Sequence, residues 1–239
     1  MSDSPEVDDK VLLITGAGSG IGAATARRMA GEYRLVLAGR RIEPLQELAA
    51  ELGGDARALA VTCDVGECDE VEAMTAAALD EFGRIDAVFA NAGFGATRGF
   101  LEETPEQWKS MILTNVLGPA LTIRATLPHL LERGDGHFLI TSSIAGRRVL
   151  PGSMYSVTKF AATTIGEALR QELRGMDDDN RIKVTLIEPG MVDTPFFDNR
   201  PGDWALKDED IANAVAYAMD QPDAVDVGEI LIRPITQGT

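Results

Sequence analysis

Seven short apolar runs alternate with longer segments of helical periodicity along almost the whole chain. None of the runs shows the regular polar alternation of a strand with one wet face, so each is expected to be buried on both faces. Parallel strands that are covered by helices and joined by right-handed crossovers have this pattern. The sequence therefore predicts an α/β fold: a single doubly wound, Rossmann-type domain with a seven-stranded, mostly parallel sheet. The expected strands are residues 11–15, 35–38, 58–61, 86–90, 137–141, 184–187 and 229–233.

The length of 239 residues fits one domain, residues 1–239, and no low-complexity linker divides it. Residues 1–8 are expected to be flexible, residues 177–180 to form a solvated turn, and residues 193–207 to form an ordered loop or lid. The periodic segments predict helices that end near Met29 and Leu52 and helices over residues 69–82, 106–131, 155–173 and 208–219.

The formal net charge of −16 argues against nucleic acid and against an anionic membrane surface as partners. No apolar run approaches the roughly 18 residues of a membrane span, and the N-terminus lacks the pattern of a secretory signal, so a cytoplasmic protein is expected. Two cysteines and two histidines are too few for a zinc site, so no metal is expected. Structural roles are expected for these four residues, which are Cys63, Cys68, His129 and His137.

A glycine-rich segment, Thr15-Gly-Ala-Gly-Ser-Gly-Ile-Gly22, lies where the first strand gives way to the first helix. Gly16 and Gly20 permit a tight turn and a close backbone approach, and Gly22 permits close helix packing. The N-terminus of the helix then offers free N–H groups and a partial positive charge to a pyrophosphate. A P-loop is excluded because no Gly-Lys-Ser/Thr follows. The segment predicts a dinucleotide site.

The end of the second strand distinguishes between two cofactors. Folds that bind NAD place an Asp or Glu there for the ribose 2′-hydroxyl, whereas this chain has Gly39-Arg40-Arg41. Gly39 leaves room for a 2′-phosphate, and Arg40 can bind it with a charge-assisted fork. The alternative is that the two arginines only start a solvated helix. The sequence favours NADP(H) over NAD(H).

Tyr155 and Lys159 lie one helical turn apart on one face of a predicted helix. A free tyrosine has a pKa near 10 and is a poor base at neutral pH. An ammonium about 4 Å away, at an effective dielectric near 20, stabilises the phenolate by about 4 kcal/mol. The pair therefore predicts general acid-base chemistry at a carbonyl or alcohol, although the same spacing also occurs by chance.

Together these motifs resemble those of the short-chain dehydrogenase/reductase family, over about residues 8–235. The resemblance implies that Tyr155 is the acid in carbonyl reduction and the base in alcohol oxidation, while Lys159 lowers its pKa and binds the nicotinamide ribose. It further implies that Ser143 binds the substrate oxygen and that Asn115 holds a water for proton relay. The motifs that carry it, in the family's order, are Thr15-Gly-x-x-x-Gly-Ile-Gly22, Asn91-Ala-Gly93, Asn115, Ser142-Ser143, Tyr155-x-x-x-Lys159 and Pro189-Gly190.

The resemblance also implies a set of cofactor contacts along the carboxyl ends of the strands. Asp64 and Val65 are expected at the adenine, and Ser19 is expected to assist Arg40 at the phosphate. The complete set is Gly16, Ser19, Gly20, Ile21, Gly22, Arg40, Arg41, Asp64, Val65, Asn91, Ala92, Gly93, Tyr155, Lys159, Pro189, Gly190, Val192 and Thr194.

The substrate is less well indicated. The C-terminal segment 229–234, with Gln237 beyond it, resembles a branch of NADP-dependent 3-hydroxy acid (serine-type) dehydrogenases and clavulanate-type aldehyde reductases. Arg147 and Arg148 could receive a substrate carboxylate or could instead be rim or subunit-contact residues. Four apolar residues could shape a pocket or only pack the loops; they are Phe94, Met191, Phe196 and Phe197.

Two other functions remain open at this stage. One is a 3-oxoacyl-thioester reductase of lipid metabolism, which shares every catalytic motif. The other is a non-catalytic NADP(H)-binding regulator, which the retention of both Tyr155 and Lys159 disfavours. The family resemblance also implies a homodimer or homotetramer that pairs through residues 106–131 and 155–173.

Overall fold

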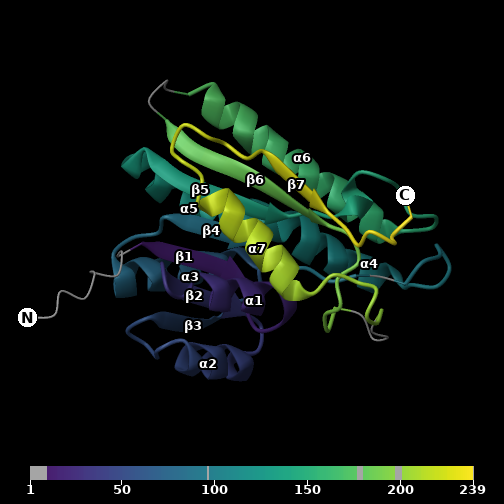
Figure 1. Cartoon of the computed structure of the whole chain (residues 1–239), viewed down its shortest axis with the longest axis horizontal. Coiled ribbons are helices and arrows are strands. Elements are labelled where there is room, and N and C mark those ends of the chain that lie inside the picture. The colour runs from purple at the N-terminus through teal and green to yellow at the C-terminus, as the bar shows by residue number, and fades with distance from the viewer. Residues whose placement is uncertain (1–9, 96, 177–179, 197–200, 239) are drawn as a thin grey trace, which may run out of the picture.

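The computed structural model describes residues 10–95, 97–176, 180–196 and 201–238. The expectations for residues 1–8, for most of the turn at 177–180 and for Phe197 fall outside these ranges. Figure 1 shows the chain as one body built around a central sheet.

The sheet has seven strands in the order β3-β2-β1-β4-β5-β6-β7, and every neighbouring pair is parallel. This confirms the predicted doubly wound fold, and the sheet is wholly rather than mostly parallel. The strand order changes direction between β1 and β4, which is where such folds bind their ligands. The strands are β1 (Val11–Thr15), β2 (Arg34–Gly39), β3 (Ala58–Thr62), β4 (Ala87–Ala90), β5 (Asp135–Thr141), β6 (Arg181–Pro189) and β7 (Glu229–Ile232).

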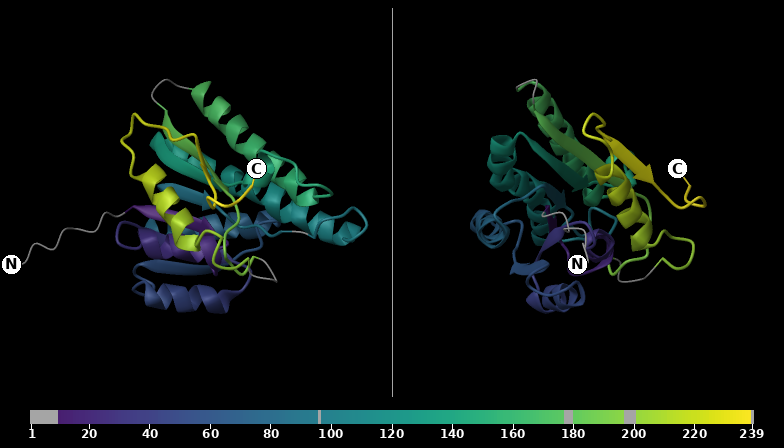
Figure 2. Two further views of the ribbon diagram at one scale, coloured as in Figure 1. Left: turned by 45° about the vertical axis from the view of Figure 1, so that its right-hand side comes forward. Right: turned by 60° about the vertical axis from the view of Figure 1, so that its left-hand side comes forward.

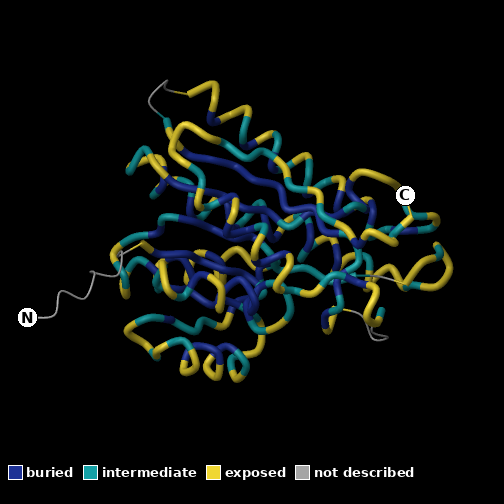
Figure 3. Tube along the Cα trace, viewed as in Figure 1, coloured by how far each residue is buried: buried dark blue, intermediate teal, exposed yellow. Residues whose placement is uncertain are grey.

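Helices cover both faces of the sheet (Figures 1 and 2). One apolar core joins the sheet to α1, α2 and α7, and a second joins it to α3, α5 and α6. The strands run through the buried centre between these layers (Figure 3), as expected from apolar runs without polar alternation. The helices are α1 (Gly20–Met29), α2 (Ile42–Glu51), α3 (Cys68–Phe82), α4 (Pro105–Ile112), α5 (Gly118–Arg133), α6 (Met154–Arg174) and α7 (Asp208–Met219).

None of the described helices is long and apolar enough to span a bilayer.

The helix predicted over residues 106–131 is interrupted. After α4, a π-helical turn, η1 (Leu113–Leu117), precedes α5. Pro119 has no N–H, so it cannot donate to the carbonyl of Asn115 in the α-helical register or to that of Thr114 in the π register. The periodicity of apolar residues continues through this break, so the sequence pattern alone does not locate it. The break falls at Asn115, and π turns inside helices often mark functional sites.

Asp86 ties together three elements at the amino edge of the sheet. Its carboxylate accepts hydrogen bonds from the backbone N–H of Val11 at 2.8 Å, from the guanidinium of Arg133 at 2.8 Å and from Arg84. The Asp86 side chain is only 10% exposed. The start of β1 and the end of α5 therefore depend on one carboxylate.

Both histidines have structural roles, as expected. The Nε2 atom of His129 accepts a hydrogen bond from the backbone N–H of Ile85 at 3.1 Å, and the Nε2 atom of His137 lies 2.7 Å from the hydroxyl of Thr185. Burial lowers the pKa of His137 to about 3, so this ring stays neutral at ordinary pH.

Asp86→Ala is expected to lower the free energy of unfolding by about 2 kcal/mol. The change leaves the Val11 N–H and two arginines without their acceptor, but both arginines reach solvent, so the cost falls below that of a fully buried pair. Urea unfolding measures the loss. Activity per folded molecule is expected to be unchanged, because the site described below lies at the opposite edge, and a fall in kcat would contradict this separation.

Candidate active site

Four loops meet at the carboxyl edge of the sheet, around the point where the strand order reverses. They follow β1, β4, β5 and β6, and they carry most of the residues singled out from the sequence.

The loop after β1 turns sharply into α1. Gly16 and Gly20 have φ angles of +68° and +51°, which residues with a side chain rarely adopt. A Cβ on Gly16 would lie 2.9 Å from the Cα of Ala92, and one on Gly20 would lie 3.2 Å from Thr194. Glycine is therefore required both by conformation and by the close approach of the loops that follow β4 and β6.

The N-terminus of α1 has no capping hydrogen bond from the side chain of its N-cap residue. The side chain of Ser19, the N-cap residue, makes no capping hydrogen bond, and the first turn contains no acidic residue. The first N–H groups of the helix therefore face the glycine loop without a side-chain acceptor. This arrangement fits the pyrophosphate of a dinucleotide.

Asn91 holds three strand ends together and is less available to a cofactor than the sequence indicated. Its amide donates to the carbonyls of Thr15 and Gly16, at 3.2 and 3.4 Å, and its Oδ1 accepts from the hydroxyl of Thr141 at 3.0 Å. The hydroxyl of Thr15 in turn accepts from the backbone N–H groups of Asn91 and Ala92. Thr15 and Thr141 were not identified as site residues from the sequence, because a strand-terminal threonine carries no distinctive pattern.

The carboxyl end of β2 has space and positive charge. The nearest atoms to a Cβ built on Gly39 belong to Leu45, 3.8 Å away, so the backbone at this position is not crowded. Arg40 and Arg41 are exposed, and neither forms an ion pair with any described residue. Arg41 is also the N-cap residue of α2. The two interpretations of these arginines, as phosphate ligands and as the start of a solvated helix, are therefore compatible.

Asp64 and Val65, the expected adenine contacts, differ in how far a ligand can reach their side chains. Asp64 is half-buried, and its Oδ1 accepts from the N–H of Gly66 at 2.9 Å. Val65 is 4% exposed and packs against Gly118 at the start of α5. The Val65 side chain therefore belongs to the core, which leaves only its backbone for a ligand.

Tyr155, Lys159 and Ser143 meet on the β5 side of this edge. Tyr155 and Lys159 lie on one face of α6, and the Lys159 Nζ is 5.6 Å from the centre of the Tyr155 ring. The side chain of Ser143 interacts with that of Tyr155, and the Ser143 hydroxyl donates to the Pro189 carbonyl at 3.3 Å. Ser142 is turned the other way: its hydroxyl donates to the Lys159 carbonyl at 3.0 Å and pairs with Thr163 at 2.7 Å.

Asn115, in the π-helical turn, lies near Lys159. Its side chain accepts from the N–H of Phe94 at 3.0 Å and donates to the Phe94 carbonyl at 2.9 Å and to the Thr158 hydroxyl at 3.2 Å. A Cβ on Gly93 would lie 3.1 Å from Asn115 Oδ1 and 3.7 Å from Lys159 Nζ. The loop after β4 therefore passes next to both residues.

The pKa values of the pair differ from the sequence-based expectation. Burial raises the pKa of Tyr155 to about 12, against a smaller lowering by the hydrogen bond to Ser143. Burial lowers the pKa of Lys159 to about 8, although its Nζ donates to the Thr141 carbonyl at 2.8 Å. The expected lowering of the Tyr155 pKa by Lys159 is therefore absent in this structure, because burial is the main influence on both groups.

The two arginines after Ser143 have different surroundings. The guanidinium of Arg147 binds Glu188 at 2.7 Å and also pairs with Glu229. These two carboxylates, Glu229 first, raise the pKa of Arg147. A substrate carboxylate would have to displace them, whereas Arg148 is exposed. Glu188, only 1% exposed at the end of β6, was not identified from the sequence.

Phe196 covers one side of Tyr155. Their rings meet edge to face with centroids 5.8 Å apart, and a Cβ on Gly95 would lie 2.6 Å from the Phe196 ring. Of the residues expected to shape an apolar wall, Phe196 thus contacts the proposed acid directly. Val192 and Thr194, which the family resemblance places at the nicotinamide end, are buried just before Phe196.

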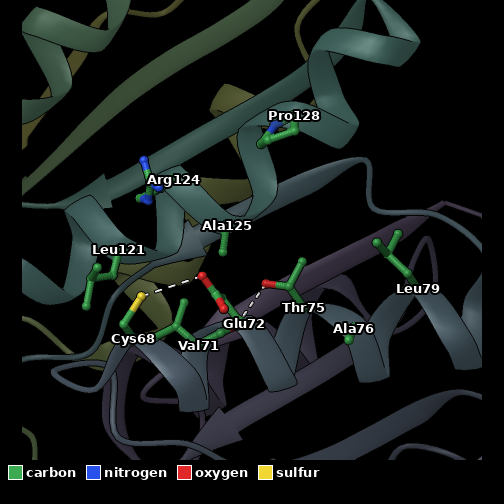
Figure 4. Close-up of a pocket in the computed structure, with 10 residues that line it drawn as sticks. All are labelled: Cys68, Val71, Glu72, Thr75, Ala76, Leu79, Leu121, Arg124, Ala125 and Pro128. Atoms are coloured by element: carbon green, nitrogen blue, oxygen red, sulfur yellow. Dashed lines mark hydrogen bonds between the residues drawn. The ribbon is translucent and has the colours of Figure 1, made fainter.

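A separate groove lies outside this region, between α3 and α5 (Figure 4). It has a volume of about 460 Å³, and the thiol of Cys68 donates to Glu72 inside it at 3.6 Å. None of its lining residues is among the catalytic or cofactor-binding residues predicted from the sequence. The described residues contain no cluster of three or more potential metal ligands.

The model of the short chain dehydrogenase family matches residues 10–204. An uncharacterized oxidoreductase of Staphylococcus aureus (strain MW2) is 40% identical over 231 residues, which cover 95% of this chain and 98% of that protein.

Solved structures agree along nearly the whole chain. An alcohol dehydrogenase from the archaeon Thermococcus sibiricus, complexed with 5-hydroxy-NADP, is 34% identical with a TM-score of 0.87, over 96% of this chain and 98% of that one. The closed form of a serine dehydrogenase complexed with NADP+ is 31% identical with a TM-score of 0.89, over 96% of each chain. A 3-ketoacyl-(acyl-carrier-protein) reductase from Brucella melitensis, complexed with NADH, is 30% identical with a TM-score of 0.86, over 95% of this chain and 98% of that one.

Lys159→Met is expected to stabilise the protein in the absence of cofactor. Burial lowers the pKa of Lys159 from 10.5 to about 8, so the charged form opposes folding fully below pH 8, progressively less as the pH rises, and not at all above 10.5. Removing the charge is expected to raise the free energy of unfolding at pH 7 by up to about 3 kcal/mol.

Urea unfolding at several pH values measures this gain. Lys109→Met, at an exposed position of α4, is the matched control and is expected to show no pH-dependent change. A gain for Lys159→Met that stays constant between pH 8 and 10.5 would contradict the assignment.

Proposed function

Since this chain belongs to the short-chain dehydrogenase family and is an NAD(P)-dependent oxidoreductase, we propose that it uses NADP(H) to interconvert a carbonyl and an alcohol. The proposed substrates are small and polar, such as a 3-hydroxy acid or an aldehyde. The observation that carries the proposal is the grouping of Tyr155, Ser143 and Lys159 at the same edge of the sheet as an uncapped helix N-terminus.

The proposed chemistry assigns one task to each side chain. Ser143 and Tyr155, whose side chains interact, polarise the substrate oxygen where negative charge develops. Tyr155 donates its proton to that oxygen in reduction and takes it back in oxidation. When bound, the nicotinamide supplies or accepts the hydride. Lys159 provides positive charge and holds the ribose.

Asn115 completes the proposed proton path. Pro119 cannot donate to the Asn115 carbonyl, and the π turn places Asn115 within reach of the Lys159 region. We propose that Asn115 binds a water molecule that connects Lys159 with solvent.

A Tyr155 pKa of about 12 favours reduction near neutral pH, because the hydroxyl then carries the proton that an alkoxide needs. Oxidation needs the phenolate, and its rate is expected to rise with pH.

The choice of NADP(H) over NAD(H) rests on the open space at Gly39 and on Arg40. The proposed cofactor site comprises the glycine loop from Gly16 to Gly22, Arg40 and Arg41, Asp64 and the Val65 backbone, Asn91 to Gly93, and Pro189 to Thr194. Its fit is supported by the similarity to dehydrogenases bound to NADP+ or 5-hydroxy-NADP.

The substrate class rests on the similarity to a serine dehydrogenase together with the exposed Arg148. The main alternative is a 3-oxoacyl-thioester reductase, which the similarity to the Brucella melitensis protein supports. A panel of 3-hydroxy acids, aldehydes and acyl-carrier thioesters, each assayed with both cofactors, separates the two. Faster turnover of the thioesters would favour the alternative.

We also propose a homodimer or homotetramer in the cytoplasm. Leu117, Val157 and Phe160 are 39%, 55% and 39% exposed, on η1 and α6, and these elements fall in the two segments through which pairing is expected. Light scattering tests the assembly directly.

Tyr155→Phe is expected to reduce kcat by about 10²–10⁴-fold, because the ring is kept while the transferable proton is lost. Steady-state kinetics measure the change. Tyr217→Phe, on the exposed face of α7, is the matched control and is expected to leave kcat unchanged. Full turnover by Tyr155→Phe would overturn the proposed chemistry.

Arg40→Ala is expected to lower kcat/KM for NADPH by about tenfold or more and to leave that for NADH nearly unchanged. The lost interaction is a charge-assisted hydrogen bond of about 1.5–3 kcal/mol. Arg28→Ala, at the far end of α1, controls for the change in net charge. An unaltered ratio of the two cofactors would remove Arg40 from the phosphate site.

A further inference from the structure

The chain beyond β7 lies at the carboxyl edge of the sheet, next to the end of β6 (Figures 1 and 2). The N–H of Gly190 donates to the carbonyl of Ile232 at 2.7 Å. After Ile232 the tail makes a turn in which the N–H of Gln237 donates to the carbonyl of Pro234 at 3.0 Å. This turn directs the Gln237 side chain back to the segment that follows β6.

Gln237 provides the acceptor for the backbone N–H of Met191, at 2.8 Å. Because an N–H can only donate, the Gln237 atom that faces it must be the amide oxygen. A Cβ on Gly190 would run into the same oxygen and would lie 2.7 Å from the Cβ of Arg233. The close approach of the tail therefore requires glycine at position 190.

The segment contacted by Gln237 leads to the glycine loop. Its other side is held by Leu206, whose N–H donates to the Met191 carbonyl at 3.0 Å and whose carbonyl accepts from Asp193 at 2.8 Å. Three residues beyond Met191, Thr194 reaches Gly20 at the start of α1. The Met191 backbone is thus connected, through Thr194, to the glycine loop at the start of α1.

We propose that Gln237 is a positioning residue: a C-terminal latch that fixes Pro189–Thr194 in the conformation that receives the nicotinamide end of the cofactor. The proposal rests on the cofactor site of the proposed function. Only the oxygen of the Gln237 amide is used, since its NH₂ group makes no hydrogen bond to any described residue. A carboxylate at this position is therefore expected to serve equally as the acceptor.

Hydrogen exchange of the protein without cofactor tests the latch by itself. In Gln237→Leu and Gln237→Ala, exchange of the Met191 amide is expected to accelerate about tenfold, because its acceptor is lost. Gln237→Glu is expected to keep the wild-type rate at pH 7. Gln221→Leu, at the end of α7, is the matched control, because its amide donates to Tyr217 on the surface. Unchanged exchange in both Gln237→Leu and Gln237→Ala would overturn the latch.

Titration with NADPH, followed by fluorescence, tests whether the latch positions the cofactor site. Gln237→Leu is expected to raise the Kd about five- to tenfold while the thermal midpoint stays within about 2 °C, and Gln237→Glu is expected to stay within threefold of wild type. An unchanged Kd in a variant with fast Met191 exchange would refute the positioning role. If wild type itself binds neither NADPH nor NADH, the proposed function fails, whatever the exchange experiment shows.

Discussion

The contact between Gly16 and Ala92 is the constraint on which the rest of the site depends. At this point the loop after β1 lies so close to the segment after β4 that a single methyl group would separate them. The hydroxyl of Thr15 and the amide of Asn91 hold the two backbones at that distance. Because the strand order reverses here, the adjacent loops diverge on either side and open the edge toward the N-terminus of α1.

A second constraint is the burial of a cation. Lys159 is 4% exposed, and its ammonium has the Thr141 carbonyl as its described hydrogen-bond partner. An apolar side chain of similar volume would fold more easily there, so the lysine is retained at a cost in stability. Hydrogen bonds fix its neighbours in place. The Thr141 hydroxyl donates to Asn91, and the Ser142 hydroxyl donates to the backbone carbonyl of Lys159 itself. The site therefore lowers the stability of the protein, but its hydrogen bonds fix the positions of its side chains.

Most of the fold follows from patterns that are local in the sequence. Apolar runs without polar alternation located all seven strands to within a few residues, and the glycine spacing located the turn into α1. The π turn at Asn115 was missed, because Pro119 interrupts hydrogen bonds without disturbing the apolar periodicity. The wholly parallel sheet agrees with the crossovers expected from alternating strands and helices.

The residues of the site were less predictable where their role depends on contacts across the fold. Tyr155, Lys159, Ser143 and Asn115 are close in space as the family motifs imply. No local pattern indicated that Glu188 and Glu229 would neutralise Arg147, since these carboxylates lie on two different strands. In the same way, burial of Tyr155 opposes the lowering of its pKa, and a spacing of four residues carries no information about burial.

The Asp86 cluster has a consequence for how such a chain can change over time. It joins the start of β1 to the end of α5 at the edge opposite the loops that bear the chemistry. Substitutions in those loops therefore do not disturb the Asp86 cluster. Substitutions that strengthen the cluster likewise do not alter the loops. A lineage built on this scaffold can acquire a new substrate and a new working temperature through separate, largely independent sets of substitutions.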